Sequence, residues 1–400
     1  MDPIPSTTFL FDSQRTGRMP YSKGKRKQPE LVWRFVLPSY PPKGPESSPA
    51  FDDQGNIYFG CHDGCFYSLD REGRLRWMFK TDAKIYSSPA IFKERVVFCS
   101  GDGHCFCFDL KGTVKWVYYA ADFFVKINNA LSRKIALART WFSTRDAVRQ
   151  RTWKTKCWTS PNISSSGVVY ITCYGIGLHA LRIEDGEPLW LYDLGQPRHH
   201  LSGVALNENE DLFVASQQKR LHSVSPAGKR RWSIKVRSGY DAWGNPSVDC
   251  ENQLVFFPLS CQEKKGCIAT YDYNGNPKWI CEIIGGLRGS VAIAAQDFVL
   301  AAGLNGFLYF IDKRKGYVAQ SVKLASEERG LWTTPALDKE GNIFITTKDS
   351  RQSGSLWCLN CTGQIEWRLE IGKALSTPVI DSQARVFVGS WNGDFLCFQT

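Results

Sequence analysis

Short apolar stretches, rich in aromatic and β-branched side chains, recur along most of the chain and are separated by turn residues. The unit is clearest over residues 47–77, where a Ser-Ser-Pro-Ala start precedes strand-like runs at 57–60 and 67–70 around an Asp-Gly turn, and a Gly-x-x-x-Trp segment ends the unit. It returns almost unchanged over 87–116. Runs of this kind predict β-strands, and four of them per unit predict a repeating four-stranded sheet.

A tryptophan closes each unit and measures its period. These tryptophans, and one glutamine in the same place, are Trp33, Trp77, Trp116, Trp190, Trp232, Trp279, Gln320 and Trp367. Successive positions are 39 to 47 residues apart, except for the 74 residues between Trp116 and Trp190. A period of roughly 40–45 residues with four strands is typical of one blade of a β-propeller. The eight positions therefore predict eight blades.

The two ends of the sequence predict how the ring closes. The last unit starts at Ser376 and reaches Thr400 with three strands, so its outer strand is missing, and residues 31–35 have the pattern of that strand. Pairing the two would shut the ring and leave no open sheet edge. We therefore expect an all-β fold, an eight-bladed propeller of four-stranded antiparallel blades over residues 31–400, closed by an N-terminal strand and preceded by a basic tail at 1–30.

One segment, 119–158, has a different pattern. Its apolar residues from Phe124 to Phe142 are three or four positions apart with arginines between them, which is a helical period. We expect a basic helical insertion that packs on the ring as a lid; a helix for a partner, or an interface with anionic lipid or nucleic acid, is the alternative. Strand order predicts that the insertion overhangs the channel mouth and that the N-terminal tail lies on the opposite face. The net charge of +11 is carried mainly by these two segments, so an acidic partner should meet them first.

The repeat also carries a family resemblance. Its Ser-Ser-Pro-Ala, Val-Tyr-x-Gly, Asp-Gly-x-x-Tyr-x-Leu-Asp and Gly-x-x-x-Trp-x-Phe segments resemble the pyrroloquinoline-quinone-like (PQQ-like) repeat of quinoprotein dehydrogenases and of the outer-membrane assembly lipoprotein. The resemblance covers 31–400 apart from the insertion. It implies the propeller fold and a ligand site at the mouth of the channel, but little about activity, because the same ring hosts enzymes, scaffolds and sensors.

The residues just before each inner strand, with their near neighbours, are the candidates for that mouth. They comprise aromatic, acidic, basic and histidine side chains, namely Glu46, Tyr86, Trp158, His199, His200, Asp241, Trp243, Arg288 and Trp332. In one interpretation the aromatic rings pack against neighbouring blades and the charges face solvent. In the other they line a pocket for a planar or cationic ligand, held by stacking and cation–π contact. The sequence leaves both open.

The fourteen cysteines bear on compartment and metals. Several of them, such as Cys107, stand where Ser68 stands in the third strand of its unit, so we expect buried free thiols in a reducing compartment rather than disulfides. The pairs at 61–65 and 358–361 have ligand-like spacing but lack a second pair nearby, so no metal site is predicted. With no leader-like pattern and no apolar run long enough for a membrane span, we expect a cytoplasmic protein.

Two classes of function remain at this point. The sequence has no adjacent cysteine pair and few carboxylates at the predicted mouth, so neither PQQ nor another cofactor is expected. The leading hypothesis is a cytoplasmic binding module that receives a small ligand or a protein partner at the mouth, with nucleic acid not expected. The alternative is a cofactor-independent enzyme of cyclase, lyase or isomerase type, with Glu46, Tyr86, His199, His200 and Asp241 as acid and base groups.

Overall fold

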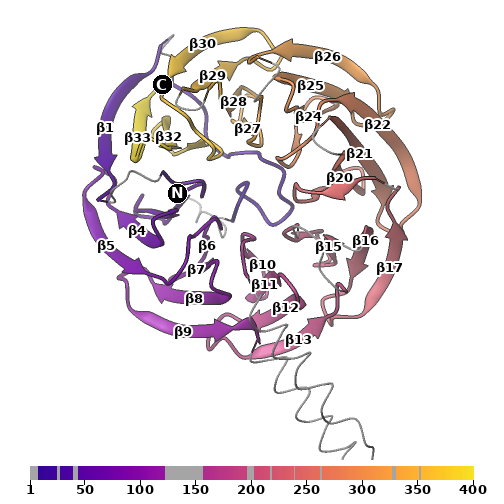
Figure 1. Cartoon of the computed structure of the whole chain (residues 1–400), viewed down its shortest axis with the longest axis horizontal. Coiled ribbons are helices and arrows are strands. Elements are labelled where there is room, and N and C mark those ends of the chain that lie inside the picture. Colours follow the sequence, from indigo (N-terminus) through magenta and orange to yellow (C-terminus); the bar gives the residue numbers. More distant parts are fainter. Residues whose placement is uncertain are drawn as a thin grey trace, which may run out of the picture.

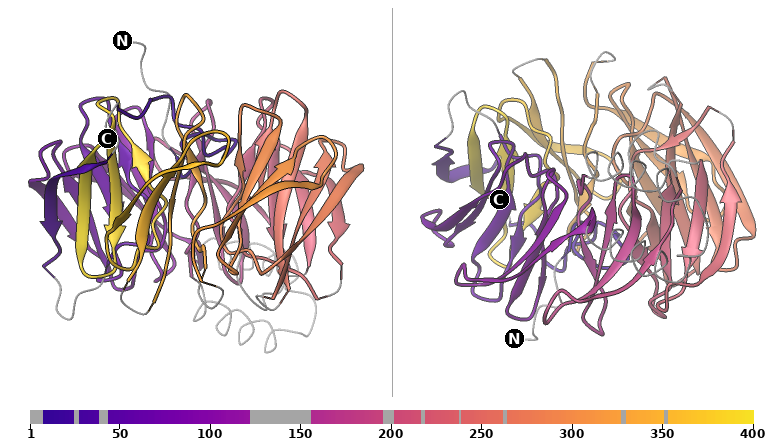
Figure 2. Two further views of the ribbon diagram at one scale, coloured as in Figure 1. Left: turned by 90° about the horizontal axis from the view of Figure 1, so that it is seen from above. Right: turned by 60° about the horizontal axis from the view of Figure 1, so that its bottom comes forward.

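The computed structural model describes residues 8–24, 28–38, 44–121, 156–195, 202–216, 219–237, 239–261, 264–326, 330–350 and 353–400. These residues form eight antiparallel sheets arranged around a central channel (Figure 1). Seen from the edge the ring is a disc, and its strands run between the two faces (Figure 2). The predicted eight-bladed, all-β propeller is therefore confirmed. Among the described residues no helix is long and apolar enough to span a membrane.

Every blade places its strands in the same order from the channel outward. The innermost strands are β2 (Ala50–Phe51), β6 (Ala90–Phe92), β10 (Asn162–Ile163), β14 (Ala205–Leu206), β19 (Ser247–Asp249), β23 (Ala292–Ile293), β27 (Ala336–Leu337) and β31 (Val379–Ile380). The second strands are β3 (Ile57–Gly60), β7 (Arg95–Cys99), β11 (Val168–Cys173), β15 (Leu212–Ser216), β20 (Leu254–Cys261), β24 (Phe298–Ala302), β28 (Ile343–Thr346) and β32 (Arg385–Ser390). We number the blades 1 to 8 in this order.

The outer half of each blade completes the pattern. The third strands are β4 (Cys65–Leu69), β8 (His104–Asp109), β12 (Gly177–Arg182), β16 (Arg220–Val224), β21 (Lys265–Asp272), β25 (Phe307–Asp312), β29 (Ser355–Leu359) and β33 (Asp394–Gln399). The outermost are β5 (Leu75–Lys80), β9 (Val114–Tyr119), β13 (Pro188–Tyr192), β17 (Arg230–Lys235), β22 (Pro277–Ile284), β26 (Val318–Lys323), β30 (Ile365–Glu370) and β1 (Glu30–Val36). Blade 5 has one additional strand, β18 (Asp241–Ala242), paired with β20.

Blade 8 closes the ring with strands from both ends of the sequence, as expected. Strand β1 pairs antiparallel with β33, in a register that runs from Glu30 opposite Gln399 to Val36 opposite Asp394. Because β33 also pairs with β32, the N-terminal strand completes a sheet whose other three strands are C-terminal. The closure therefore uses backbone hydrogen bonds rather than side-chain packing alone.

The Gly-x-x-x-Trp motif joins neighbouring blades. The indole of Trp77, in blade 1, lies against Gly112 of blade 2, where the Cβ of any larger residue would lie 2.8 Å from the ring. The same indole donates its N–H to the backbone oxygen of Leu110 at 3.2 Å. Gly112 has a φ of +92°, so glycine is favoured there both by the backbone and by the ring above it. Each glycine of the motif thus receives the tryptophan of the preceding blade.

The joint recurs with two informative exceptions. Indole–glycine contacts of the same kind are Trp33 with Gly73, Trp116 with Gly186, Trp190 with Gly228, Trp232 with Gly275 and Trp279 with Gly316. Gln320 replaces the tryptophan in blade 6 and still donates to the backbone oxygen of Thr362 at 3.1 Å. The indole nitrogen of Trp367 has no hydrogen-bond partner among the described residues. In the other joints the acceptor lies in the turn before the outer strand, and blade 8 has no such turn because β33 and β1 come from opposite ends of the sequence.

A segment of the N-terminal region crosses the channel instead of leaving the ring as a tail. Residues 8–24, which we call the strap, run along the C-terminal ends of the innermost strands (Figure 1). Strap carbonyl oxygens accept hydrogen bonds of 2.8 to 2.9 Å from the amides of Leu206, Val248, Ile293 and Leu337, in four successive blades. The side chains of Arg15 and Arg18 donate to backbone oxygens of the ring. These cations therefore hold the strap in place and do not face an acidic partner.

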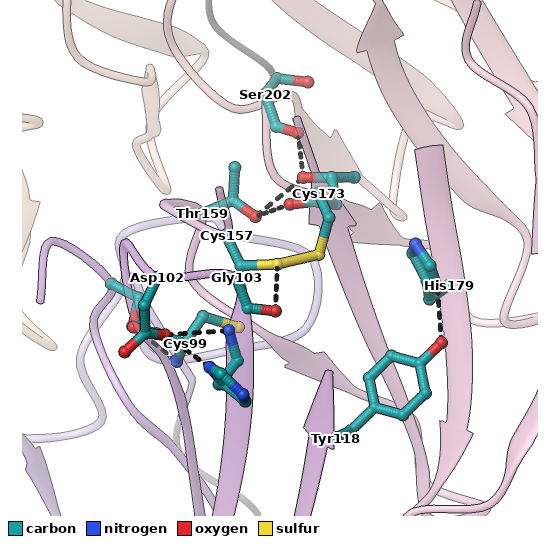
Figure 3. Close-up of a disulfide and its surroundings, with 12 residues drawn as sticks. Cys99, Asp102, Gly103, Tyr118, Cys157, Thr159, Cys173, His179 and Ser202 are labelled. Atoms are coloured by element: carbon teal, nitrogen blue, oxygen red, sulfur yellow. Dashed lines mark hydrogen bonds and ion pairs between the residues drawn. A yellow bond between two sulfur atoms is a disulfide. The ribbon is translucent and has the colours of Figure 1, made fainter. Parts of the chain in front are cut away.

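One disulfide corrects the expectation that all cysteines are free. Cys157 is bonded to Cys173 at the end of β11, with an S–S distance of 2.10 Å, and Cys157 Sγ lies 3.6 Å from the backbone oxygen of Gly103 (Figure 3). The other twelve cysteines are free, and most are buried. Nine of the free thiols lie inside strands of the repeat, and Cys61, Cys250 and Cys361 lie in turns. Cys157 instead follows the insertion, where alignment of the repeats gives no equivalent position. The predicted helical insertion itself lies largely outside the described residues.

Replacing Gly112 tests the inter-blade joint. Gly112→Ala adds a methyl group against the Trp77 indole, so we expect it to lower the free energy of unfolding by about 1–3 kcal/mol more than Gly55→Ala does. Gly55 is the matched control, because its φ of +79° is similar but a Cβ there meets nothing closer than 3.8 Å. Urea denaturation measures both variants. Equal losses would show that the indole contact adds nothing to the cost of the backbone conformation.

Candidate ligand site in the central channel

A cavity of about 610 Å³ occupies the centre of the ring. Six of the predicted mouth residues line it, each from a different blade: Glu46, Tyr86, Trp158, Trp243, Arg288 and Trp332. They meet because each stands just before the innermost strand of its blade. All the innermost strands begin at the same end of the channel, so the residues that precede them lie around one opening. Phe9 of the strap lines the cavity as well.

The other three predicted residues are two histidines and Asp241. His199 and His200 lie outside the described residues. Asp241 belongs to β18, is opposite Ser260 of β20, and lies 3.9 Å from the Lys219 ammonium. It is not among the cavity-lining residues, because pairing of β18 with β20 places it in the blade rather than on the channel wall.

Cations already cover several of the indole rings at the mouth. The Arg288 guanidinium lies 3.5 Å from the ring centre of Trp243 and 5.2 Å from that of Trp332. Lys348 and Lys156 lie 4.7 and 4.9 Å from the ring centres of Trp332 and Trp158. Partial burial lowers the pKa of Arg288 below its usual range. A cationic ligand would have to displace these groups, so the observed side chains favour an anionic ligand over the cationic one that the sequence allowed.

The carboxylate of Glu46, in blade 1, lies next to His62 of the same blade and near Tyr86 of blade 2. Glu46 lies 3.3 Å from Nε2 of His62, whose ring is buried against Tyr86 and Trp391 at centroid distances of 4.4 and 5.4 Å. Burial, and to a smaller extent the charge of Glu46, raise the pKa of Tyr86. Sequence reasoning missed His62 because it lies in the turn after a second strand. Tyr174, a cavity-lining residue, likewise follows β11, the second strand of its blade. A search of the positions just after each second strand would therefore have found both residues.

A ring of hydrogen bonds links the blades just below the mouth. Among the described residues of six of the eight blades, the second residue of the Ser-Ser-Pro-like start donates its backbone N–H to the side-chain oxygen of the equivalent residue in the next blade. The observed links, each 2.5 to 3.1 Å, are Ser48 to Ser88, Ser88 to Ser160, Gly203 to Asn245, Asn245 to Ser290, Ser290 to Thr334 and Thr377 to Ser48. These hydroxyl and amide residues, apart from Gly203, line the cavity.

The strap lies beside the interruption of this ring at blade 4 and crosses the far end of the channel. Gly203 has no side chain to accept from Ser160, and a Cβ built on it would lie 3.1 Å from Nη2 of Arg15. Arg15 is fully buried; its Nη2 donates to the Ser160 backbone oxygen at 2.9 Å and its Nε to that of Val204. The Phe9 ring lies 5.5 Å from the guanidinium. The cavity therefore ends at Phe9, with Arg15 beside it.

Comparison with known proteins assigns this architecture. A sequence model of the family described as outer membrane protein assembly factor BamB matches residues 25–202 and 177–399, which together cover most of the chain. The chain belongs to the PQQ-like propeller family. This membership rests on the repeats and not on any one site residue.

Solved structures with the same fold have very different sequences and functions. BamB from Moraxella catarrhalis is 16% identical, with a TM-score of 0.69 over 93% of this PQQ-like propeller and all of that chain. A europium-containing methanol dehydrogenase is 11% identical, with a TM-score of 0.68 over 98% of each chain. The computationally designed Ika8 protein is 12% identical, with a TM-score of 0.66 over 93% and 100%. At these identities the likeness shows the fold alone.

One curated protein matches a short stretch of this PQQ-like propeller more closely. The β-alanine-activating enzyme of Mus musculus is 47% identical over 36 residues, which are 9% of this chain and 3% of that enzyme. The match therefore covers less than one blade and carries no inference about activity.

The cavity of this PQQ-like propeller does not fit a quinone held over calcium. Glu46 is the single carboxylate among its described lining residues, and the described part of the chain holds no group of three metal-ligating side chains. Cys157, next to Trp158, is bonded to Cys173 on another strand and not to an adjacent cysteine.

The strap carries a carboxyl group whose titration should be visible in stability. Burial raises the pKa of Asp12 from 3.8 to about 6, although Thr16 donates to it through both its amide and its hydroxyl. The folded state then holds this proton more tightly than the unfolded chain, so the contribution of Asp12 to the free energy of unfolding should fall as pH rises from about 4 to about 6 and level off above. Asp12→Asn should remove this contribution, so the free energy of unfolding of the variant should rise relative to that of wild type across the same range, as measured by urea denaturation. Asp53→Asn, an exposed control, should follow wild type; a constant difference between Asp12→Asn and wild type would contradict the assignment.

Proposed function

We propose that this PQQ-like propeller is a binding module whose ligand or protein partner enters the channel at the mouth formed by Glu46, Tyr86, Trp158, Trp243, Arg288 and Trp332. The observation that carries the proposal is the central cavity, which combines aromatic walls with fixed charges of both signs. Pockets of several hundred Å³ with mostly apolar walls and few polar groups are typical ligand sites. The rigid ring keeps these groups in place before binding, which reduces the entropy lost on association.

The family supports a binding role as well. Its model is named for an assembly factor, and the BamB structure covers almost the whole propeller. A protein partner would place a side chain or a chain end in the cavity and rest on the surrounding loops. The proposal includes an acidic partner that also contacts segment 121–158. The support for this contact is the positive charge of that segment in the sequence.

A cofactor-independent enzyme is the second candidate, and one observation favours it. Glu46, His62 and Tyr86 form a cluster at the cavity wall, and a carboxylate next to an imidazole is a common pair for moving a proton. In this alternative His62 takes the place that the sequence assigned to His199 and His200. The mechanism would be acid–base catalysis on a ligand held at the same mouth.

The decisive experiment removes two indoles at the mouth. Native mass spectrometry and affinity purification of the full chain from its own cells should show a bound molecule that is lost in Trp243→Ala/Trp332→Ala, because both rings line the cavity. Met78→Ala/Tyr317→Ala is the control, since both of these side chains are exposed on the outer strands or turns. Thermal melting shows that each variant is folded.

The possible outcomes separate the candidates. Loss of the molecule in the tryptophan variant but not in the control supports the binding site. Equal retention in both overturns it. If the bound molecule is a small compound that wild type converts and Glu46→Gln does not, the enzyme candidate replaces the binding module.

We also propose that the protein works in the cytoplasm, supported by the twelve free cysteines, most of them buried. Fractionation of cells that make the tagged full chain should place it with cytoplasmic markers. Recovery of the chain with exported proteins would refute the proposal.

A further inference from the structure

The ring of side chains below the mouth offers hydrogen-bond donors to the cavity. The hydroxyls of Ser48, Ser88, Ser160, Ser290 and Thr334 each accept a backbone N–H from the neighbouring blade. A hydroxyl group has one hydrogen to donate, and none of these five donates it to another residue in the described part of the chain. All five line the cavity. Their remaining donors are therefore available to whatever the cavity contains.

The strap adds a buried cation to the same level of the channel. Arg15 is fully buried, and three of its neighbours line the cavity: Ser160, Asn245 and Phe9. Its Nε and Nη2 donate to backbone oxygens, whereas Nη1 has no hydrogen-bond partner among the described residues. Leaving a charged donor unmatched in a buried place is costly, which points to a missing acceptor at this position.

Cations outnumber carboxylates in the described lining of the cavity. Glu46 is the single carboxylate there and faces His62, whereas Arg288 and Lys156 are both lining residues. At the closed end the side chains that reach the cavity are hydroxyls, the Asn245 amide and the aromatic ring of Phe9. A group that carries several acceptor oxygens and a negative charge matches this end, and a cation does not.

We infer that the closed end of the cavity binds an oxyanion, the carboxylate or phosphate group of the molecule that the mouth receives. The hydroxyl ring supplies hydrogen bonds around this group and Arg15 supplies the opposite charge, while the remainder of the molecule extends toward the mouth. This inference rests on the proposed function, because it names the chemical group at one end of the ligand that the same cavity is proposed to bind.

Titration of the full chain with simple oxyanions tests the inference. Inorganic phosphate and benzoate are added separately at constant ionic strength, with chloride as the reference ion, and binding is followed by tryptophan fluorescence and by calorimetry. Trp158, Trp243 and Trp332 line the cavity and so report occupancy. We expect saturable binding of at least one oxyanion, and the stronger of the two identifies whether the group is a phosphate or a carboxylate.

Two matched pairs of variants locate the oxyanion. Arg15→Gln should weaken binding at least tenfold, because Arg15 donates to Ser160, which lines the cavity. Arg18→Gln should not, because Arg18 lies on the same strap but donates to Ile293 and Ala294, which do not line the cavity. Thr334→Val should weaken binding several-fold by removing one donor. Thr270→Val is its control, since Thr270 is buried in β21, away from the cavity lining. The threonine pair decides the question if Arg15→Gln does not fold.

The inference fails if wild type shows no saturable response to either oxyanion, or if each variant binds as well as its control. The cavity end would then hold only water. Such a result, together with loss of the bound molecule in Trp243→Ala/Trp332→Ala, overturns this inference and leaves the proposed function intact. Retention of the bound molecule in that variant would instead overturn the proposed function.

Discussion

The packing of one indole on one glycine in the next blade is the contact on which the ring depends. Each blade is a small sheet that cannot bury both faces alone, and the tryptophan of one blade covers the turn of its neighbour at Gly73, Gly112, Gly186, Gly228, Gly275 and Gly316. The glycine is required because its φ is positive and because a Cβ would enter the indole ring. Repetition of this contact sets the spacing between blades and therefore the width of the channel.

The width of the channel creates the need for the strap. Eight blades leave a space at the centre that the short innermost strands do not fill, and an open channel would expose their amides at the far face. The strap accepts hydrogen bonds from four blades in succession and buries Arg15 where Gly203 interrupts the ring of side chains. One segment thus satisfies the backbone and turns a channel into a cavity with one open end.

The mouth gains its character from the same geometry. Residues that are far apart in sequence, such as Glu46 and Arg288, reach one cavity because every blade places the residue before its innermost strand at the same end of the channel. The stacking of Arg288 between Trp243 and Trp332 then decides what those rings can do, since their faces already contact a guanidinium. Acidic and basic groups occupy different blades, so different sides of the mouth carry opposite charges, and these charges orient a ligand that enters the cavity.

The sequence by itself determined the number of blades, the composite eighth blade and six cavity-lining residues. Each of these follows from the sequence repeat, because every repeat folds into the same four-stranded sheet and places equivalent residues at equivalent positions. The tertiary structure alone decided the rest. His62 reaches Glu46 from a different turn, and Cys157 pairs with Cys173 after an insertion that breaks the repeat. The strap has no repeat pattern, and its partners are more than 140 residues away in most cases, as with Arg15 and Ser160. Such contacts depend on the closed ring, which brings distant blades to one axis, and no local pattern encodes them.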